Sequence, residues 1–326
     1  MKRALICGVG GQDGAYLAAL LLERGYEVWG TSRDAQAAGM QNLHRLGLNG
    51  RVRLLSMAPN DFRSVFLAVE RSAPDEIYYL SGQSSVGLSF EQPAETLESI
   101  VSGVLNMLEV VRLRGGSIRL YNAGSSECFG DTGDSVADET TPFHPRSPYA
   151  VAKASAHWLV ANYREAYGLY CCTGILFNHE SPLRPARFVT RKIVAGAAAI
   201  AAGAGGKLVL GNLDIARDWG WAPEYVEAMH RMLTAETPDD YVIATGHTTR
   251  LEDFVAAAFA HFGLDWRDHV ETSAEFARPS DIRTSRADPS RAAERLGWRA
   301  QSRMEDVVRR MCEAETGPAS SPLYRV

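Results

Sequence analysis

The sequence lacks the features that mark metal-binding, secreted and membrane-spanning proteins. Its five cysteines form no CxxC pair and its histidines show no HExxH-like spacing, so neither a disulfide frame nor a metal site is expected. The Ala-rich stretch 194–206 is too short and too rich in glycine to cross a bilayer, and the apolar run 4–7 is far shorter than the core of a signal peptide. We therefore expect a cytoplasmic protein with no membrane partner.

An excess of basic charge is also missing. With 34 basic and 39 acidic residues the formal net charge is −5, so no global positive field favours nucleic acid or anionic lipid as a partner. The chain has 326 residues, of which 46% are apolar, enough for one large or two medium domains with a substantial core.

What the sequence does contain is an alternation of short β-like runs and helical patterns. The predicted strands are 3–8, 26–31, 51–56, 75–80, 118–123 and 170–177, and the helices between them include 15–25, 61–72 and 96–112. This alternation predicts an α/β fold of the Rossmann type, a doubly wound parallel sheet covered on both faces. Beyond residue 177 the elements become shorter, with helices predicted at 194–206, 251–262 and in two final segments, the first beginning at Asp288 and Pro289.

A glycine-rich turn follows the first predicted strand and opens the first helix. Gly8, Gly11 and Gly14 fit the pattern G-x-x-G-x-x-G, in which side chains would keep the backbone away from a pyrophosphate at the helix N-terminus. A plain tight turn between strand and helix is the alternative. The position of the glycine-rich turn directly after the first strand favours a dinucleotide cofactor.

The end of the second predicted strand bears on the choice of cofactor. Thr31, Ser32 and Arg33 supply hydroxyls and a guanidinium, which suit the 2′-phosphate of NADP better than the ribose of NAD. Asp34 keeps NAD open as the alternative, and Arg33 is otherwise an ordinary surface charge.

A tyrosine and a lysine lie four residues apart at the start of a predicted helix. Tyr149 and Lys153 therefore share one helix face. The ammonium and the positive nicotinamide ring of an oxidised cofactor are expected to lower the pKa of the phenol towards neutrality and make it a base for an alcohol proton. Alone this spacing is a weak signal, and exposed side chains would explain it. Together with the glycine-rich turn and a serine after the fifth strand it becomes specific.

These motifs are the marks of the extended short-chain dehydrogenase/reductases, and a closer resemblance runs from residue 10 to residue 298. The chain resembles the GDP-mannose 4,6-dehydratases in the segments GGQDGAYLAALLLERGYEV, GSSECFG, TTPFHPRSPYAVAKA, NYREAYGLY, GILFNHESP, FVTRKI, LGNLDIARDWGWAPEYVEAM and DPSRAAERLGW. The resemblance implies oxidation at C4 of the sugar, loss of water across C5 and C6, and return of the hydride to C6.

The resemblance assigns the chemistry to four residues. Tyr149 would take the proton of the 4-hydroxyl with Ser125 and Lys153 beside it, and Glu127 would be the acid–base group for elimination. A simple dehydrogenase or a C4 epimerase has no use for such a carboxylate, although a strand-end glutamate is more often merely solvated. Residues two apart on a strand share a face, so we expect Ser125 and Glu127 to address one sugar.

The resemblance also implies the binding residues. The cofactor would be held by Gly8, Gly11, Gln12, Asp13, Gly14, Ser32, Arg33, Leu80, Tyr149 and Lys153. The GDP-sugar would be held by Ser85, Asn178, Glu180, Val189, Lys192, Arg217, Arg278 and Asp281, with the arginines on the diphosphate.

The expected domains are an NADP-binding Rossmann domain (1–177 with 212–246) and a smaller, mostly C-terminal α/β substrate domain (178–211 and 247–326). The segment 183–188, LRPARF, departs from the family pattern of two arginines, a glycine and an acid, so GDP-D-glycero-D-manno-heptose stands beside GDP-mannose as a candidate substrate. A homodimer or homotetramer is expected. The rival hypotheses are a related GDP-sugar 4-reductase or epimerase, and a non-catalytic NADP-sensing protein.

Overall fold

The computed structural model describes residues 1–273, 275 and 279–317. Its centre is a seven-stranded sheet in the order β10-β6-β5-β4-β1-β2-β3, in which every neighbouring pair is parallel. The strands are β1 (Arg3–Cys7), β2 (Glu27–Ser32), β3 (Arg53–Ser56), β4 (Glu76–Tyr79), β5 (Arg119–Ala123), β6 (Cys171–Leu176) and β10 (Tyr241–Ile243). This order confirms the predicted doubly wound fold, with the switch of direction between β1 and β4.

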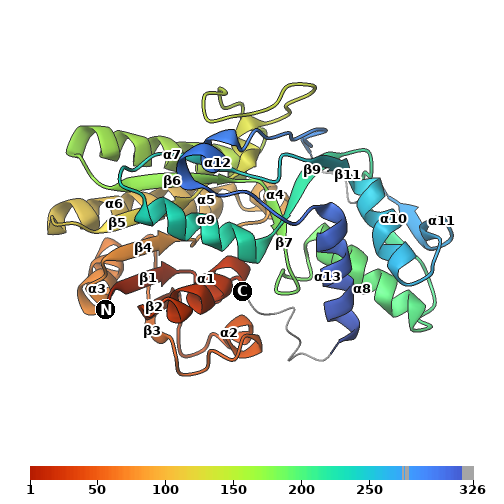
Figure 1. Ribbon diagram of the computed structural model, residues 1–326, viewed down its shortest axis with the longest axis horizontal. Helices are drawn as coiled ribbons and strands as arrows, with labels where there is room; N and C mark the ends of the chain where they lie inside the picture. Colours follow the sequence, from red (N-terminus) through yellow and green to blue (C-terminus); the bar gives the residue numbers. More distant parts are fainter. Residues whose placement is uncertain (274, 276–278, 318–326) are drawn as a thin grey trace.

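Helices cover both faces of this sheet (Figure 1). One face packs on α1 (Gln12–Glu23) and α9 (Ala222–Thr234), and the other on α3 (Phe62–Ser72), α6 (Gly103–Arg114) and α7 (Pro148–Tyr167). In β1, Ala4 and Ile6 enter the first core and Leu5 and Cys7 the second, because successive side chains of a strand point to opposite faces. The strand is therefore apolar throughout, as in other buried parallel strands.

Short elements complete this part of the molecule. They are α2 (Gln41–Arg45), α4 (Val86–Glu91), α5 (Pro93–Leu97), the π-helix η1 (Glu98–Ser102), the 3-10 helix η2 (Ser126–Phe129) and α12 (Ser290–Leu296).

A smaller lobe lies beside the carboxyl ends of the strands (Figure 1). It has a three-stranded sheet, β11-β9-β7, and a two-stranded sheet, β12-β8. Three of its helices, α8, α10 and α13, share a separate apolar core with Trp219 and Trp221. The elements are β7 (Asn178–Glu180), α8 (Val189–Ala201), β8 (Leu208–Leu210), β9 (Ala216–Trp221), β11 (Thr248–Arg250), α10 (Leu251–His261), α11 (Trp266–His269), β12 (Val270–Thr272) and α13 (Met304–Thr316).

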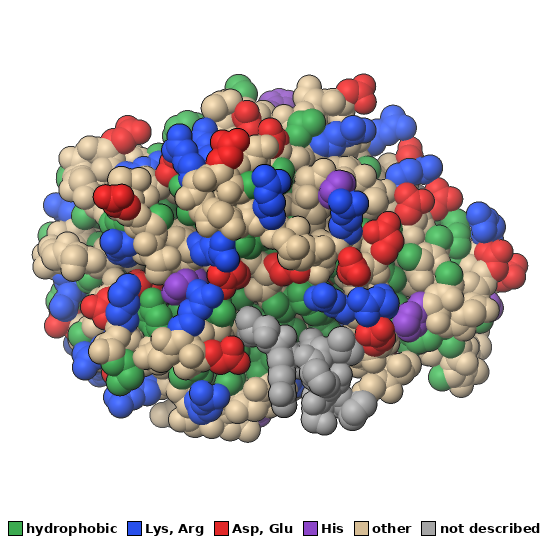
Figure 2. Space-filling model, in the orientation of Figure 1, with side chains coloured by type: hydrophobic (Ala, Val, Ile, Leu, Met, Phe, Trp, Pro, Cys, Tyr) green, Lys and Arg blue, Asp and Glu red, His purple; other side chains and the backbone are tan. Residues whose placement is uncertain are grey.

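Two surface properties bear on partners. On the face drawn in Figure 2, basic and acidic side chains are interspersed over both parts of the molecule. Within the described ranges, no helix combines the length and the apolar character that crossing a membrane requires.

Candidate active site

A cavity of about 580 Å³ opens where several strands of the main sheet end. Its wall includes Leu80 after β4, Ala123 at the end of β5 and Leu176 at the end of β6. The opposite wall comes from the smaller lobe, with Asn178 of β7 and Arg217 of β9. In open parallel sheets, ligands bind in the crevice outside the carboxyl ends of the strands, and this cavity occupies that place.

The cavity brings most of the predicted site residues together. Its lining includes Asp13, Leu80, Ser85, Ser125, Glu127, Tyr149, Lys153, Asn178, Glu180, Val189, Lys192, Arg217 and Asp281. The predicted residues outside this lining are Gly8, Gly11, Gln12, Gly14, Ser32 and Arg33. Arg278, predicted to bind the diphosphate, lies outside the described residues.

The first turns of α7 place Tyr149 and Lys153. Ser147 caps this helix by accepting a hydrogen bond of 3.1 Å from the N–H of Ala150, and Pro148 occupies the first position, where a missing N–H costs nothing. Tyr149 and Lys153 follow within the next turn and are both buried, with the ammonium 5.8 Å from the centroid of the phenol ring. The predicted shared face of the helix is therefore confirmed.

Burial is the main influence on the pKa values of both Tyr149 and Lys153. Burial raises the pKa of Tyr149, and the hydrogen bond with Ser125 only partly opposes that rise. Burial also lowers the pKa of Lys153 to about 8. The Lys153 ammonium donates a hydrogen bond of 2.7 Å to the carbonyl of Ala123, at the end of β5. Desolvation of the buried phenol dominates its pKa here, and the predicted shift towards neutrality, which also depends on the positive nicotinamide ring of an oxidised cofactor, stays a prediction.

The prediction that Ser125 and Glu127 lie on a strand is wrong. β5 ends at Ala123, and Ser125 is the N-cap of the 3-10 helix η2, where its hydroxyl accepts a hydrogen bond of 3.3 Å from the N–H of Glu127. The shared strand face is therefore the wrong reason for their proximity. Both residues nevertheless line the same cavity, because η2 lies at the end of β5, where the cavity opens.

The glycine-rich turn is as tight as the motif requires. Gly8 has φ +87°, a region that favours glycine, and its carbonyl accepts a hydrogen bond of 3.1 Å from the N–H of Gly11. A Cβ on Gly14 would collide with the Gly8 carbonyl oxygen and lie 2.7 Å from the Cα of Val9. The turn thus brings bare backbone to the N-terminus of α1, a cradle that fits the pyrophosphate of a dinucleotide.

The same turn is joined to β7 by side chains that the sequence reasoning missed. His179 Nε2 lies 2.9 Å from Asp13 Oδ2, and Gln12 Nε2 donates a hydrogen bond of 3.2 Å to the His179 carbonyl. Ser181 Oγ donates to Gln12 Oε1 at 2.7 Å. Burial opposes both charges, but their mutual attraction outweighs it: the pKa of Asp13 is lowered and that of His179 is raised. The segments QDG and FNHES each resemble a family motif. No local pattern in the sequence, however, indicates that Asp13 and His179, which are 166 positions apart, contact each other.

Arg33 lies away from the cavity lining. Its side chain is 82% exposed and pairs with Glu95 at 3.4 Å. Ser32, at the end of β2, accepts a backbone hydrogen bond of 2.8 Å from Met57. To bind a phosphate, the Arg33 guanidinium would have to break only its exposed ion pair with Glu95. Such a pair contributes at most about 1 kcal/mol to stability.

The lobe side of the cavity is rich in charged groups. The side chain of Arg217 is 6% exposed and lies 3.6 Å from Asp281. Lys192 on α8 donates a hydrogen bond of 2.7 Å to the carbonyl of Val209. In the segment that departs from the family pattern, Arg184 stacks on Phe188 with 3.9 Å between the guanidinium carbon and the ring centroid. Both cations and carboxylates therefore line this side of the cavity.

A second, smaller cavity of about 380 Å³ lies between β11 and the N-terminus of α13, and its lining contains none of the predicted site residues. Among the residues that the structure describes, no cluster of three or more His, Cys, Asp or Glu side chains could hold a metal ion.

Comparison with known proteins gives a consistent picture. The family model described as GDP-mannose 4,6 dehydratase matches residues 5–311. The chain is 45% identical to GDP-mannose 4,6 dehydratase 1 of Arabidopsis thaliana over 96% of its length and 90% of that protein. It is 40% identical to GDP-mannose 4,6-dehydratase of Yersinia enterocolitica, covering 95% of this chain and 93% of that protein.

Solved structures show the same fold at lower identity. A dTDP-glucose 4,6-dehydratase of Bacillus anthracis in complex with NAD superimposes with a TM-score of 0.84 at 18% identity, covering 96% of both chains. RMD of Pseudomonas aeruginosa complexed with NADPH gives a TM-score of 0.79 at 21% identity, covering 97% of this chain and 99% of that one.

Proposed function

The chain belongs to the GDP-mannose 4,6-dehydratase family, and on that premise we propose that it is a GDP-sugar 4,6-dehydratase, a hydro-lyase that converts GDP-mannose to its 4-keto-6-deoxy product. One observation carries the proposal beyond family membership. Ser125, Glu127, Tyr149 and Lys153 line a single cavity, together with charged residues suited to a diphosphate.

The first step is oxidation at C4. Tyr149 receives the proton of the 4-hydroxyl, and Ser125, which shares a hydrogen bond with that phenol, binds the same sugar oxygen. Lys153 lies behind the phenol, with its ammonium held by the Ala123 carbonyl. With a pKa of about 8, Lys153 remains largely charged at neutral pH, and its ammonium favours the phenolate form of Tyr149 that accepts the proton from the substrate.

The second step is elimination. The C4 ketone acidifies the hydrogen on C5, and Glu127 removes that proton and supplies one to the departing C6 hydroxyl, so that water leaves without net change in its own protonation state. A 4-reductase or a C4 epimerase breaks no C6–O bond. The acid–base carboxylate beside the oxidising residues is therefore what favours a dehydratase over those two activities.

The glycine-rich turn supports a nicotinamide cofactor. The crowded Gly14 and the backbone at the N-terminus of α1 suit a pyrophosphate, and Asp13 and Leu80 reach the cavity. When bound, the nicotinamide would take the C4 hydrogen as hydride and return it to C6. We favour NADP over NAD because Ser32 ends β2 and Arg33 follows it, and Arg33→Ala should weaken NADP binding far more than NAD binding in titration calorimetry.

The remaining parts of the proposal concern the substrate and the assembly. Arg217 would bind the diphosphate and Asp281 the nucleotide ribose, while Val189 and Lys192 would line the guanine pocket; Ser85, Asn178 and Glu180 would contact the sugar side. We propose a Rossmann domain (1–177 with 212–246) and a substrate domain (178–211 and 247–326) that exchange elements: β9 of the first joins the sheet of the smaller lobe, and α12 of the second packs on α9 of the first.

We also propose a homodimer or homotetramer in the cytoplasm. Val151 and Trp158 on α7 are 43% and 63% exposed, and Leu113 on α6 is 58% exposed, so both of these packed helices carry exposed apolar side chains that a second copy could cover. Light scattering coupled to gel filtration measures the assembly. A monomer at micromolar concentration would exclude both states.

The test of function is to incubate the protein with GDP-mannose, and in parallel with GDP-D-glycero-D-manno-heptose, and to follow product mass. Loss of one water without net consumption of added NADPH is expected, and the faster substrate identifies the sugar. A product of unchanged mass indicates an epimerase, and stoichiometric consumption of NADPH indicates a reductase. Bound NADP without turnover of either sugar supports the sensor hypothesis.

A further inference from the structure

Residues 281–288 form a connecting segment between the smaller lobe and the loop that follows η2. Along one edge the segment is bound to the loop that follows η2: the N–H of Thr132 donates to the Thr284 carbonyl at 3.0 Å, and the N–H of Ala137 donates to the Arg286 carbonyl at 3.0 Å. Along the other edge it is bound to β9, where the N–H of Ala216 donates to the Arg283 carbonyl at 2.7 Å. The segment thus joins the end of η2 to the start of β9.

Asp131 makes the charged contacts of this junction. Its carboxylate accepts hydrogen bonds from two successive backbone N–H groups of the segment, Arg283 at 3.0 Å and Thr284 at 3.2 Å, and from Gly133 at 3.0 Å. Burial acts to raise the pKa of Asp131, but these N–H groups and the charge of Arg217 outweigh it and hold the pKa below its usual value. The carboxylate is therefore ionised, and each of these hydrogen bonds is charge-assisted.

The same residues of the segment hold Arg217. The Arg283 carbonyl is 3.5 Å from Arg217 Nη1, which also donates to the Ala216 carbonyl at 2.9 Å, and Asp281 lies 3.6 Å from Arg217 Nη2. The contacts therefore run from Asp131 through the Arg283 peptide to the guanidinium at the cavity wall. Glu127 lies only four residues before Asp131, on the other side of Gly130.

We propose that Asp131 is a positioning residue that fixes the distance between Glu127, at the C5–C6 side of the sugar, and Arg217, at the diphosphate. This inference rests on the proposed dehydratase function. The two groups must engage one substrate at its two ends. Asp131 is hydrogen-bonded to the segment that contacts Arg217, and it follows Glu127 by four residues in the chain. Asp131 touches neither the sugar nor the cofactor in this account.

The position matters because elimination depends on geometry. Displacement of a reacting group by about 1 Å can lower a rate by about 10²-fold. Oxidation at C4 uses Tyr149 and Lys153, which α7 holds independently of the connecting segment, and Ser125, which lies further along the chain from Asp131 than Glu127 does. Loosening the junction should therefore slow elimination more than oxidation, and should also weaken the grip on the diphosphate.

The test uses Asp131→Asn in the full-length protein. The amide keeps the size of the side chain but turns an NH2 group towards backbone N–H donors. Asp134→Asn is the matched control, since it makes the same change three residues later in the same loop at an exposed carboxylate. Thr132→Val is a second variant, because the Thr132 hydroxyl donates to the Thr284 carbonyl at 3.2 Å and accepts from the N–H of Arg286 at 3.1 Å.

Three readouts separate positioning from a general loss of structure. For Asp131→Asn we expect a Kd for GDP raised about 5- to 10-fold, a kcat on GDP-mannose lowered about 10-fold or more, and enzyme-bound 4-keto sugar that has not lost water in acid-quenched samples. Thr132→Val should show the same pattern at smaller size, and Asp134→Asn should match the wild type.

The possible outcomes distinguish a failure of the inference on Asp131 from a failure of the proposed function. Equal behaviour of Asp131→Asn and Asp134→Asn overturns the inference, as does a fall in kcat that only follows the folded fraction while the Kd for GDP stays unchanged. A wild-type protein that binds GDP but dehydrates no GDP-sugar refutes the proposed function, and the ratio of GDP affinities still tests Asp131. A wild-type protein that does not bind GDP refutes both.

Discussion

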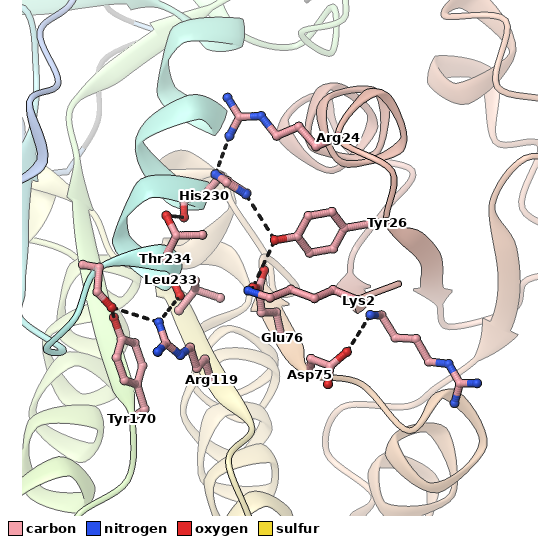
Figure 3. A network of polar contacts seen from close by, with 12 residues as sticks. Lys2, Arg24, Tyr26, Asp75, Glu76, Arg119, Tyr170, His230, Leu233 and Thr234 are labelled. Carbon is pink, nitrogen blue, oxygen red and sulfur yellow. Dashed lines mark hydrogen bonds and ion pairs between the residues drawn. The ribbon is translucent and has the colours of Figure 1, made fainter.

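The polar network at the amino ends of the strands yields a prediction whose size follows from the structure. Glu76, the first residue of β4, is 1% exposed (Figure 3). Its carboxylate accepts hydrogen bonds from the hydroxyls of Tyr78 at 2.8 Å and Tyr26 at 3.1 Å, and from the ammonium of Lys2 at 2.9 Å. Tyr26 is also 3.2 Å from a ring nitrogen of His230 on α9, so the network joins the sheet to that helix.

The perturbation is a double-mutant cycle between Glu76→Leu and Tyr78→Phe. A hydrogen bond to a charged acceptor contributes about 1.5–3 kcal/mol, and a buried hydroxyl left without an acceptor costs about 1–3 kcal/mol. The Tyr78 hydroxyl is such a group, because its residue is fully buried. The cycle cancels the gain from no longer burying a carboxylate, so we expect a coupling free energy of about 2 kcal/mol between the two positions. Tyr78→Phe should destabilise the wild type and should be stabilising once Glu76 is leucine, because it then removes a buried hydroxyl that has lost its acceptor.

The assay is urea unfolding of the four proteins at pH 7, followed by far-ultraviolet circular dichroism. Tyr170→Phe is the matched control, because its hydroxyl donates to the carbonyls of Met232 and Ala235 at 2.9 and 2.8 Å in the same region (Figure 3). Its cycle with Glu76→Leu should be additive within about 0.5 kcal/mol. A coupling below about 0.5 kcal/mol for the Tyr78 cycle would refute the reasoning.

Three further predictions concern the site. Gly14→Ala should raise the Kd for NADP at least about 10-fold in calorimetry, whereas Gly205→Ala, where a Cβ meets nothing within 4 Å, should not; equal affinities would contradict the reading of the turn. Lys153→Met should lower the rate of C4 oxidation by about 10²-fold or more with little change in GDP affinity, and a wild-type rate would remove Lys153 from the chemistry. The raised pKa of His179 contributes stability that is present below its ordinary value of 6.5 and lost as pH rises through the folded value, while the lowered pKa of Asp13 contributes stability above 3.8 that is lost on acidification. The Tm advantage of the wild type over His179→Gln should therefore be largest between about pH 4 and 6.5 and shrink as pH rises through the raised pKa of His179, and a constant difference would contradict the pairing.

The sequence predicted the main sheet well because its strands are buried on both faces. The six predicted strands correspond to β1 to β6 within one or two residues at most ends. The seventh strand, β10, was missed because it has only three residues. In the smaller lobe, β9 was missed because it buries Arg217 and Asp218, and Asp218 is fully buried while accepting hydrogen bonds from the N–H groups of Thr245 and His247. Charged residues at such positions hide a strand from any hydrophobic pattern.

The candidate site shows the same division. Tyr149 and Lys153 follow from helix spacing and from the cap at Ser147, which are local properties. The positions of Ser125 and Glu127 came from a motif, and the strand geometry inferred for them was wrong because η2 begins as soon as β5 ends. The contacts of Asp13 with His179 and of Asp131 with the connecting segment join residues more than 150 positions apart, so only the folded chain reveals them.

The central claim is that one cavity oxidises C4 and then eliminates water with Glu127. GDP-mannose carrying deuterium at C4 tests it directly, with the wild type and Glu127→Gln compared by mass spectrometry and NMR. We expect the wild-type product to have lost one water and to carry the deuterium at C6, and Glu127→Gln to stop at the 4-keto sugar with its water retained. Deuterium lost to solvent or left at C4 of a wild-type product, or full turnover by Glu127→Gln, would contradict it.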